Sequence, residues 1–208
     1  MKKIAVIGTH GVGKTTLCDY LSSYTKSLGK KVACVGEVVR DCPYPINQGM
    51  CYKAAEWTVF SQVLRERKEE RENPDLIICD RSFFDPMIYL DMAKKVYDEG
   101  EVHLHRGLRG FASNFLFCYD TIYLVQPSKR PIDSDGFRDT NKEFQEKIHD
   151  WFSEELDEML DDYYMTMEEV GEAFKYDKLV VINSDEIFAS PIDICMRIYK
   201  KCFSQLGH

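Results

Sequence analysis

Residues 8–16 read GTHGVGKTT and follow the apolar run IAVI, so three glycines, one lysine and three threonines are gathered in one short stretch. The stretch matches the pattern G-x-x-x-x-G-K-[ST] at every fixed position. Glycines let the backbone turn its amide N–H groups inward around an anion, and the start of a following helix adds unpaired donors. The lysine supplies a charge for the β- and γ-phosphates, and the threonine hydroxyl supplies a ligand for Mg²⁺. The sequence therefore predicts a cradle for a nucleoside triphosphate, made of Gly8, His10, Gly11, Val12, Gly13, Lys14, Thr15 and Thr16.

An acidic residue and an arginine follow the apolar run LIIC, in the triplet Asp80-Arg81-Ser82. An acid at the carboxyl end of a parallel strand can reach the Mg²⁺ of such a cradle, so we predict that Asp80 and Thr15 hold the metal and that Asp80 is catalytic. Arg81 is suited to bind an anionic or hydroxyl-rich substrate. The alternative is a salt bridge at the strand end between Asp80 and the neighbours of Arg81.

Glu37 and Arg40 follow the second predicted strand, in the string GEVVRD. A carboxylate at this strand end faces the crevice beside the cradle, where it could accept or orient the proton of an acceptor hydroxyl. We predict Glu37 as a catalytic residue and both residues as part of the substrate site. The alternative is an ordinary surface Glu–Arg pair. Which of Glu37 and Asp80 activates the acceptor stays open here.

Residues 126–140, QPSKRPIDSDGFRDT, are polar, basic and rich in turn-forming residues. Such a segment after a strand predicts a lid that closes over the phosphates and excludes water. Arg138 and Arg130 would then neutralise the charge that develops during transfer, Arg138 as a catalytic group and Arg130 as a group that binds the nucleotide. The alternative is a plain surface loop.

Aromatic side chains are candidates for the acceptor site. Tyr52, Trp57 and Phe84, with Phe83 as a further candidate, could stack on a nucleobase. For Trp57 and Phe84 the alternative is a place in the core, because both lie on apolar stripes of helical spacing. His10, inside the cradle, is expected to be an exposed side chain and is assigned no chemistry.

The donor is predicted to be ATP, because a guanine-reading Asn-Lys-x-Asp is missing. The nearest string, Asn141-Lys-Glu-Phe144, lacks the aspartate. A motor-type ATPase usually ends its third strand with an acidic pair, whereas here an arginine follows a single acid. Residues 183–185, after the fifth predicted strand, are a candidate contact for adenine or form only a turn. A small-molecule kinase with ATP and Mg²⁺ as cofactors remains.

Short apolar runs alternate with helical patterns along the chain. The runs 2–8, 31–38, 76–82, 121–127 and 178–184 are nearly continuous in apolar residues, which is typical of strands covered on both faces. Helical spacing occupies 14–28, 53–72 and 85–98, less clearly 101–118, and the regions after 140 and 190, and a second capping form at Thr166 leaves open whether the region after 140 holds one helix or two. We predict an α/β, P-loop kinase-like three-layer sandwich over residues 1–208, with a five-stranded parallel sheet and helices on both faces.

Composition limits the partners. The chain of 208 residues carries a formal net charge of −8, which disfavours binding along a nucleic-acid backbone. It shows neither a stretch of membrane-spanning length nor a signal peptide, and its eight cysteines lack metal-ligand spacing. We expect a cytoplasmic protein with reduced thiols that acts on a small molecule, without a membrane partner; a homodimer is left open.

The order of these motifs resembles the NadR-like and Ttd14-like P-loop family of AAA type, whose kinases are related to nicotinamide riboside kinases. The triplet at residue 80 is also similar to that of deoxynucleoside kinases. The matching strings are the cradle, Glu37-Val-Val-Arg40, Asp80-Arg-Ser-Phe-Phe-Asp85 and Asp135-Gly-Phe-Arg138, which together span most of the chain. The resemblance implies an ATP-dependent, kinase-like protein and leaves its substrate unnamed.

The leading hypothesis is a phosphotransferase that moves the γ-phosphate of ATP to a hydroxyl or phosphate of a small molecule, a nucleoside or nucleotide. One alternative is a kinase that acts on the 5′ end or a modified base of DNA, although the net acidity weighs against it. The other is a nucleotide-binding switch with slow hydrolysis.

Overall fold

The computed structural model describes residues 1–93, 99–128, 141–169 and 178–204. Five strands form one parallel sheet in the order β2-β3-β1-β4-β5. The strands are β1 (Lys2–Ile7), β2 (Val32–Val35), β3 (Leu76–Asp80), β4 (Thr121–Gln126) and β5 (Leu179–Asn183). Each strand lies inside one of the apolar runs, and the predicted five-stranded parallel sheet is confirmed.

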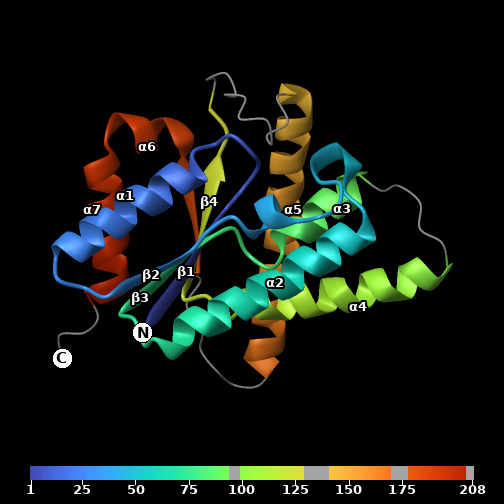
Figure 1. Ribbon diagram of the computed structural model, residues 1–208, viewed down its shortest axis with the longest axis horizontal. Helices are drawn as coiled ribbons and strands as arrows, with labels where there is room; N and C mark the ends of the chain where they lie inside the picture. Colours follow the sequence, from blue (N-terminus) through green and yellow to red (C-terminus); the bar gives the residue numbers. More distant parts are fainter. Residues whose placement is uncertain (94–98, 129–140, 170–177, 205–208) are drawn as a thin grey trace.

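Helices cover both faces of the sheet and complete the predicted three layers (Figure 1). On one face lie α1 (Lys14–Ser27), α6 (Ser184–Ala189) and α7 (Pro191–Phe203). On the other lie α2 (Tyr52–Arg71), α3 (Asp85–Ala93), α4 (Glu99–Leu116) and α5 (Lys142–Glu169). Two short 3₁₀ helices, η1 (Val38–Asp41) and η2 (Asn47–Gly49), connect β2 to α2.

The central strand β1 shows how the sheet divides the core. Ala5 and Ile7 belong to the apolar cluster under α2, α3, α4 and α5, whereas Ile4 and Val6 belong to the cluster under α1 and α7. All four side chains are 0% exposed. Because successive side chains of a strand point to opposite faces, a strand covered on both sides must be apolar throughout, which explains the continuous apolar runs.

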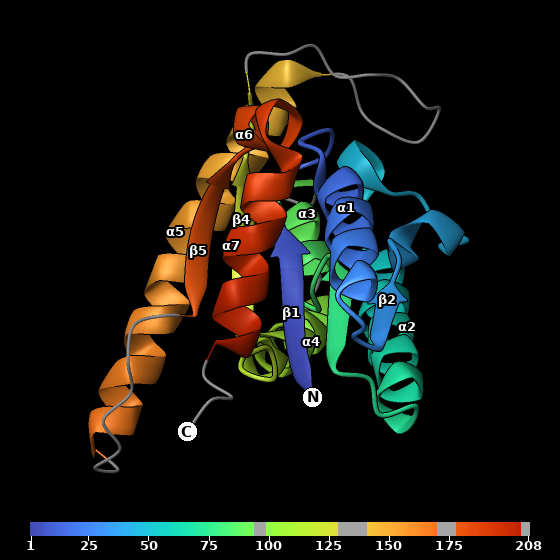
Figure 2. The same cartoon turned by 90° about the vertical axis from the view of Figure 1, so that its left-hand side faces the viewer.

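The strand order places the site. From β1 the chain runs to β2 at one edge of the sheet and returns to β3, beside β1; it then continues on the other side of β1 with β4 and β5, so the order reverses beside β1. In open parallel sheets, ligands bind in the crevice at the carboxyl ends of the strands where this reversal occurs. The segments after β1, β2 and β3 therefore meet at one edge of the sheet, and Figure 2 shows the end of β1 below α6 and the start of α1.

The helix α2 buries a different face from the one its large apolar residues suggest. Phe60 is 47% exposed and Leu64 is 71% exposed, although with Trp57 they form an apolar stripe of helical spacing, which is typical of a buried helix face. The buried face instead carries small and polar residues: Ala54, Ala55, Thr58, Val59, Gln62 and Glu66. The face toward the core is therefore half polar, which helical periodicity of apolar residues cannot reveal.

The structure also answers two questions that the sequence left open about the helices. The long region after residue 140 forms one continuous helix, α5, which runs through Thr166 without a break. Residues 183–185 are more than a turn: the Asn183 side chain accepts a hydrogen bond of 2.8 Å from the amide of Asp185 and thereby caps α6. No helix in the described ranges is long and apolar enough to cross a membrane.

Candidate active site

The loop between β1 and α1 is held in conformations that favour glycine. The φ angle is 128° at Gly8, 73° at Gly11 and 90° at Gly13. A Cβ atom at Gly8 would also lie 2.6 Å from the carbonyl oxygen of Val125 in β4. Since no side chain in the described part of the chain caps the start of α1, its first amides are available to an anion. The loop is thus a preformed anion-binding turn.

Lys14 is a buried cation at the centre of this turn. Its side chain is 5% exposed, and its Nζ donates to the carbonyl oxygen of Thr9 at 2.6 Å. Burial, together with repulsion from Arg81, lowers the pKa of Lys14 to about 8. A cavity of about 260 Å³ adjoins it, lined by His10, Gly11, Gly13, Lys14, Thr15, Glu37 and Arg81. We call this cavity the donor cradle.

Thr15 and Asp80 meet across the sheet edge, as the sequence predicted for a metal site. The Thr15 hydroxyl donates to Asp80 Oδ2 at 2.5 Å. Asp80 Oδ1 is buried and has no hydrogen-bond partner in the described part of the chain, and burial raises the pKa of this carboxyl group. A hydroxyl beside a carboxylate with an unused oxygen fits Mg²⁺, whose remaining ligands in such sites are phosphate and water oxygens.

Arg81 joins the strand ends electrostatically. Its backbone has a φ angle of 89°, which is rare for a residue other than glycine. Its Nε donates to Glu37 Oε1 at 2.6 Å, and its Nη1 lies 3.3 Å from Asp85 Oδ1 and 3.5 Å from the carbonyl oxygen of Gly8. The side chain predicted to grip the substrate is therefore already fixed by two carboxylates.

Asp85 holds this arrangement from the start of α3. Its Oδ2 accepts hydrogen bonds from the Ser82 amide at 2.8 Å and from the Ser82 hydroxyl at 2.7 Å. Its Oδ1 faces Arg81, so one carboxylate fixes both the turn after β3 and the guanidinium. The sequence signal for this role is the position of Asp85 three residues after Ser82, at the end of the string Asp80-Arg-Ser-Phe-Phe-Asp85.

Glu37 is a mostly buried carboxylate that lines the donor cradle. It accepts hydrogen bonds at 2.6 Å from Arg40 Nε and from Arg81 Nε. Burial alone would raise the pKa of Glu37, but Arg81 and Lys14 outweigh it and hold the pKa well below its usual range. The predicted Glu37–Arg40 pair exists, yet with Glu37 mostly buried it is not an exposed surface pair. The salt bridge considered for Asp80 is not what the structure shows: Asp80 accepts a hydrogen bond from Thr15. The ion pair at the strand ends is formed by Arg81 and Glu37.

A second cavity, of about 400 Å³ with its open mouth, adjoins the donor cradle at Arg81. We call it the acceptor cavity. Its walls come from η1, η2, α2 and the start of α3. They are formed by Val38, Val39, Asn47, Met50, Thr58, Gln62, Arg81, Ser82, Asp85, Pro86 and Tyr89. Arg81 lines both cavities, so the two cavities share this side chain as a common wall.

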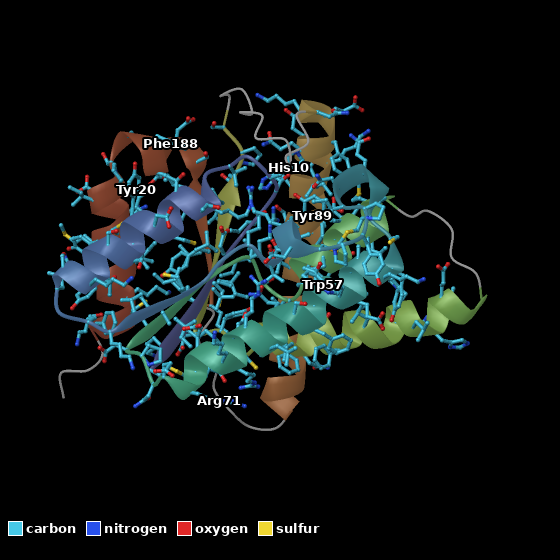
Figure 3. The ribbon with its side chains drawn as sticks, viewed as in Figure 1. His10, Tyr20, Trp57, Arg71, Tyr89 and Phe188 are labelled. Carbon is cyan, nitrogen blue, oxygen red and sulfur yellow. The ribbon has the colours of Figure 1, made fainter. Side chains whose placement is uncertain are left out.

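The predicted aromatic residues lie outside this lining. Phe84 is 0% exposed in the core, so it has no surface to offer a base, and its predicted stacking role is wrong for this reason. Trp57 and Tyr52 are half-buried on α2, and the Tyr52 hydroxyl lies 3.5 Å from the carbonyl oxygen of Leu104 (Figure 3 labels Trp57). The aromatic ring in the lining is Tyr89, which sequence reasoning had not singled out.

His10 is buried, contrary to the exposed side chain that we expected. Its Nδ1 lies 3.1 Å from the hydroxyl of Tyr89 (Figure 3 labels both residues). Its ring stacks on Phe144 of α5 at 5.8 Å between centroids. The Gln145 side chain donates to the His10 carbonyl oxygen at 2.6 Å. His10 therefore ties the cradle to α3 and α5 and belongs to the structure of the loop.

Other predicted residues are placed as follows. Val12 is buried in the core under α1, and its carbonyl oxygen accepts a hydrogen bond of 2.7 Å from Ser184. Thr16 is half-buried in the first turn of α1. Arg130, Arg138 and the lid beyond residue 128 lie outside the described residues, so their roles stay predictions.

Fold and cradle together define a P-loop NTPase: a glycine-rich turn after the central strand, a lysine and a threonine at the helix start, and an acid on the neighbouring strand. A family model described as an AAA domain matches residues 3–172, and the chain belongs to that family. No curated protein matches the chain.

Solved structures with the same fold include two of the deoxyadenosine kinase from M. mycoides. The one with dATP bound has a TM-score of 0.56 and 16% identity, and the match covers 96% of this chain and 100% of that chain. The one with products dCMP and a flexible dCDP has a TM-score of 0.52 and 18% identity, over 96% and 98% of the two chains. The likeness confirms the kinase-like fold that the motif order predicted.

Proposed function

We propose that this chain is an ATP- and Mg²⁺-dependent phosphotransferase that moves the γ-phosphate of ATP to a hydroxyl or phosphate group of a nucleoside or nucleotide. The observation that carries the proposal is the pair of cavities that meet at Arg81. A protein that only hydrolyses a nucleotide needs no second cavity beside the phosphates, whereas a transferase must hold an acceptor there.

In the proposed reaction, Lys14 and the amides of the loop bind the donor phosphates. When a triphosphate binds, the Lys14 Nζ leaves the Thr9 carbonyl oxygen for the phosphate oxygens, which are better acceptors. Thr15 and Asp80 would hold Mg²⁺, which supplies positive charge to the β- and γ-phosphates. Since catalysis of this kind depends on positioning and charge, no covalent intermediate is required.

Glu37 is the proposed acceptor-orienting carboxylate. Its pKa is held well below the usual range by Arg81 and Lys14, so it stays ionised and accepts a hydrogen bond from the acceptor hydroxyl. A carboxylate with such a low pKa is a weak base. We therefore propose that Glu37 orients the acceptor hydroxyl and does not mainly act by removing its proton. Asp80 is bonded to Thr15 and is assigned to the metal.

The nucleoside-sized acceptor and the adenine donor are supported by the solved neighbours, which are kinases named for deoxyadenosine, one of them with dATP bound. The missing guanine motif supports ATP independently. All eight cysteines are free thiols, which fits the cytoplasmic location that we propose.

The test measures ADP release from ATP by the purified chain with nucleosides, nucleotides and DNA ends, each with and without Mg²⁺. We expect at least one nucleoside or nucleotide to raise ADP release about a hundredfold above hydrolysis without acceptor, with the phosphorylated product detected by mass. Stimulation by DNA ends alone, with a steep salt dependence, would make the chain a polynucleotide kinase. ATP binding without any stimulated turnover would make it a switch protein.

A further inference from the structure

Two backbone carbonyl groups of the loop between β1 and α1 are held by side chains from distant parts of the chain. Gln145, in the first turn of α5, donates to the carbonyl oxygen of His10, 135 residues earlier, at 2.6 Å. Ser184, the first residue of α6, donates to the carbonyl oxygen of Val12, 172 residues earlier, at 2.7 Å. Because α5 and α6 cover opposite faces of the sheet (Figure 1), the loop is held from both sides.

Both contacts are buried, and both can be made in only one chemical sense. Gln145 is 3% exposed and Ser184 is 1% exposed. A carbonyl oxygen only accepts hydrogen bonds, so Gln145 must turn its amide nitrogen toward the loop, and Ser184 must direct its single hydroxyl hydrogen there. Each side chain is therefore committed to one backbone oxygen of the loop.

A held carbonyl group also fixes the direction of the amide that follows it. A peptide unit is planar, and in the trans form its C=O and N–H bonds point in opposite directions. No peptide bond in the described residues is cis. The His10 carbonyl points toward α5, so the N–H of Gly11 points away from α5. In the same way, the Val12 carbonyl points toward α6, and the N–H of Gly13 points away from α6.

These two amides are the donors that the donor cradle offers to an anion. Gly11 and Gly13 both line the cavity. Neither glycine amide donates to another group in the described part of the chain. An amide that lines a cavity and makes no internal hydrogen bond is available to a phosphate oxygen.

The glycines themselves do not ensure this direction. The φ angle is 73° at Gly11 and 90° at Gly13, and a residue without a Cβ atom reaches other angles at little cost. The peptide units before these glycines can therefore rotate unless something holds them. A rotated unit would turn its carbonyl oxygen toward the cradle, where it would repel the oxygens of a phosphate. The contacts from α5 and α6 hold both carbonyl oxygens on the outside of the loop.

We propose that Gln145 and Ser184 are positioning residues for the nucleotide. From behind the loop, they orient its peptide units so that the amides of Gly11 and Gly13 face the phosphates before the nucleotide binds. Donors that are already oriented need no reorganisation on binding, which favours the bound state. The inference rests on the proposed function, because it requires a triphosphate in the cradle, and it adds two residues that lie outside the glycine-rich motif.

The first measurement is the dissociation constant of ATP·Mg, determined by calorimetry without acceptor. It compares the unmodified chain with Gln145→Leu and Ser184→Ala, each of which removes one donor and little volume. We expect each variant to bind ATP·Mg about tenfold more weakly, because one hydrogen bond from an amide to a charged oxygen is misdirected.

The second measurement assigns each side chain to its own amide. The chain is labelled with ¹⁵N-glycine, and the amide signals of Gly11 and Gly13 are followed by NMR as ATP·Mg is added. In the unmodified chain both amide protons should move downfield, as expected on hydrogen bonding to phosphate. Gln145→Leu should abolish the shift of Gly11 and keep that of Gly13, and Ser184→Ala should do the reverse. A side chain that only supports the fold would not produce this crossed pattern.

A matched control separates these effects from a general loss of stability. Tyr119→Phe removes a buried hydrogen bond of 2.6 Å to Glu66 just before the amino end of β4, far from the loop at the carboxyl ends of the strands. This variant should bind ATP·Mg as tightly as the unmodified chain, and urea unfolding checks that every variant is folded. If Gln145→Leu does not fold, Gln145→Met replaces it, and Ser184→Ala tests the second peptide unit independently.

Each outcome decides the inference. Unchanged ATP·Mg affinity in both variants overturns it while the proposed function stands. Equal loss of both glycine shifts in each variant also overturns it, because the two residues would then be general supports of the loop. An unmodified chain that binds no ATP·Mg overturns the inference and the proposed function together. Weaker binding with the crossed pattern supports the inference even if no acceptor is phosphorylated, so that failure of the proposed transfer is seen separately.

Discussion

The donor cradle and the acceptor cavity share Arg81, yet they are built in different ways. The cradle comes mainly from one continuous stretch, residues 8–15, whose glycine conformations and helix start already point donors at one place. The acceptor cavity is assembled from η1, η2, α2 and α3, which are brought together by packing. The triphosphate group is the same in every nucleotide donor, so one local motif can bind it. Acceptor molecules differ from one kinase to another, and an acceptor site is therefore built from contacts between distant segments.

The largest effect of a substitution is expected in the donor cradle, at Lys14. We expect Lys14→Ala to lower kcat/KM for ATP by about a thousandfold, because the other described cation of the cradle, Arg81, is already paired with Glu37 and Asp85. Stability should change little, since Lys14 makes one hydrogen bond to the backbone. Turnover with a fixed acceptor and urea unfolding check both parts, and transfer that survives the substitution would remove the cradle from the mechanism.

At the junction, Glu37→Gln should lower kcat by about a hundredfold while the dissociation constant of ATP changes little. The amide keeps the shape but loses the charge that orients the acceptor and pairs with Arg81. Arg40→Gln is the control, because it removes the other partner of Glu37 at the more exposed side. Unchanged turnover in Glu37→Gln would make Glu37 a support for Arg81 and no more.

The smallest effect is expected on stability, for a substitution at Gly8 that tests whether the backbone of the cradle requires glycine. Gly8→Ala should destabilise the fold by about 2 kcal/mol, because a Cβ atom would meet the Val125 carbonyl at 2.6 Å in a backbone conformation that favours glycine. Gly36→Ala, with nothing within 4 Å and no positive φ angle, should be nearly neutral. Equal unfolding midpoints for the two variants in urea would show that the turn adapts freely.

The strands of the sheet and the residues at their carboxyl ends could be predicted from the sequence. Continuous apolar runs gave all five strands because a doubly covered parallel sheet leaves no polar face. The pairing of Thr15 with Asp80 was predictable because parallel strands end at one edge. The adjacency of Glu37 to Arg81 was anticipated only in part: both were placed in the crevice, but their direct bond was not.

The expectations that the structure corrects concern the direction in which side chains point, toward the core or toward solvent. Phe84 is fully buried and His10 is turned inward onto Tyr89 and Phe144. On α2 the apolar stripe at Phe60 and Leu64 is largely exposed, and a polar face packs inward. A buried polar face is stable only when each of its groups finds a partner, and those partners come from elsewhere in the chain.

By itself, the sequence determined the P-loop turn, because its conformations are set by glycine, by the start of a helix and by residues within one turn of each other. Only the tertiary structure decided which side chains lie beside that turn. Lys3 and Glu66 are 63 residues apart, and their ion pair next to Gln62 exists only once β1 and α2 pack together. The free energy of such buried contacts depends on three-dimensional neighbours, and no local pattern records them.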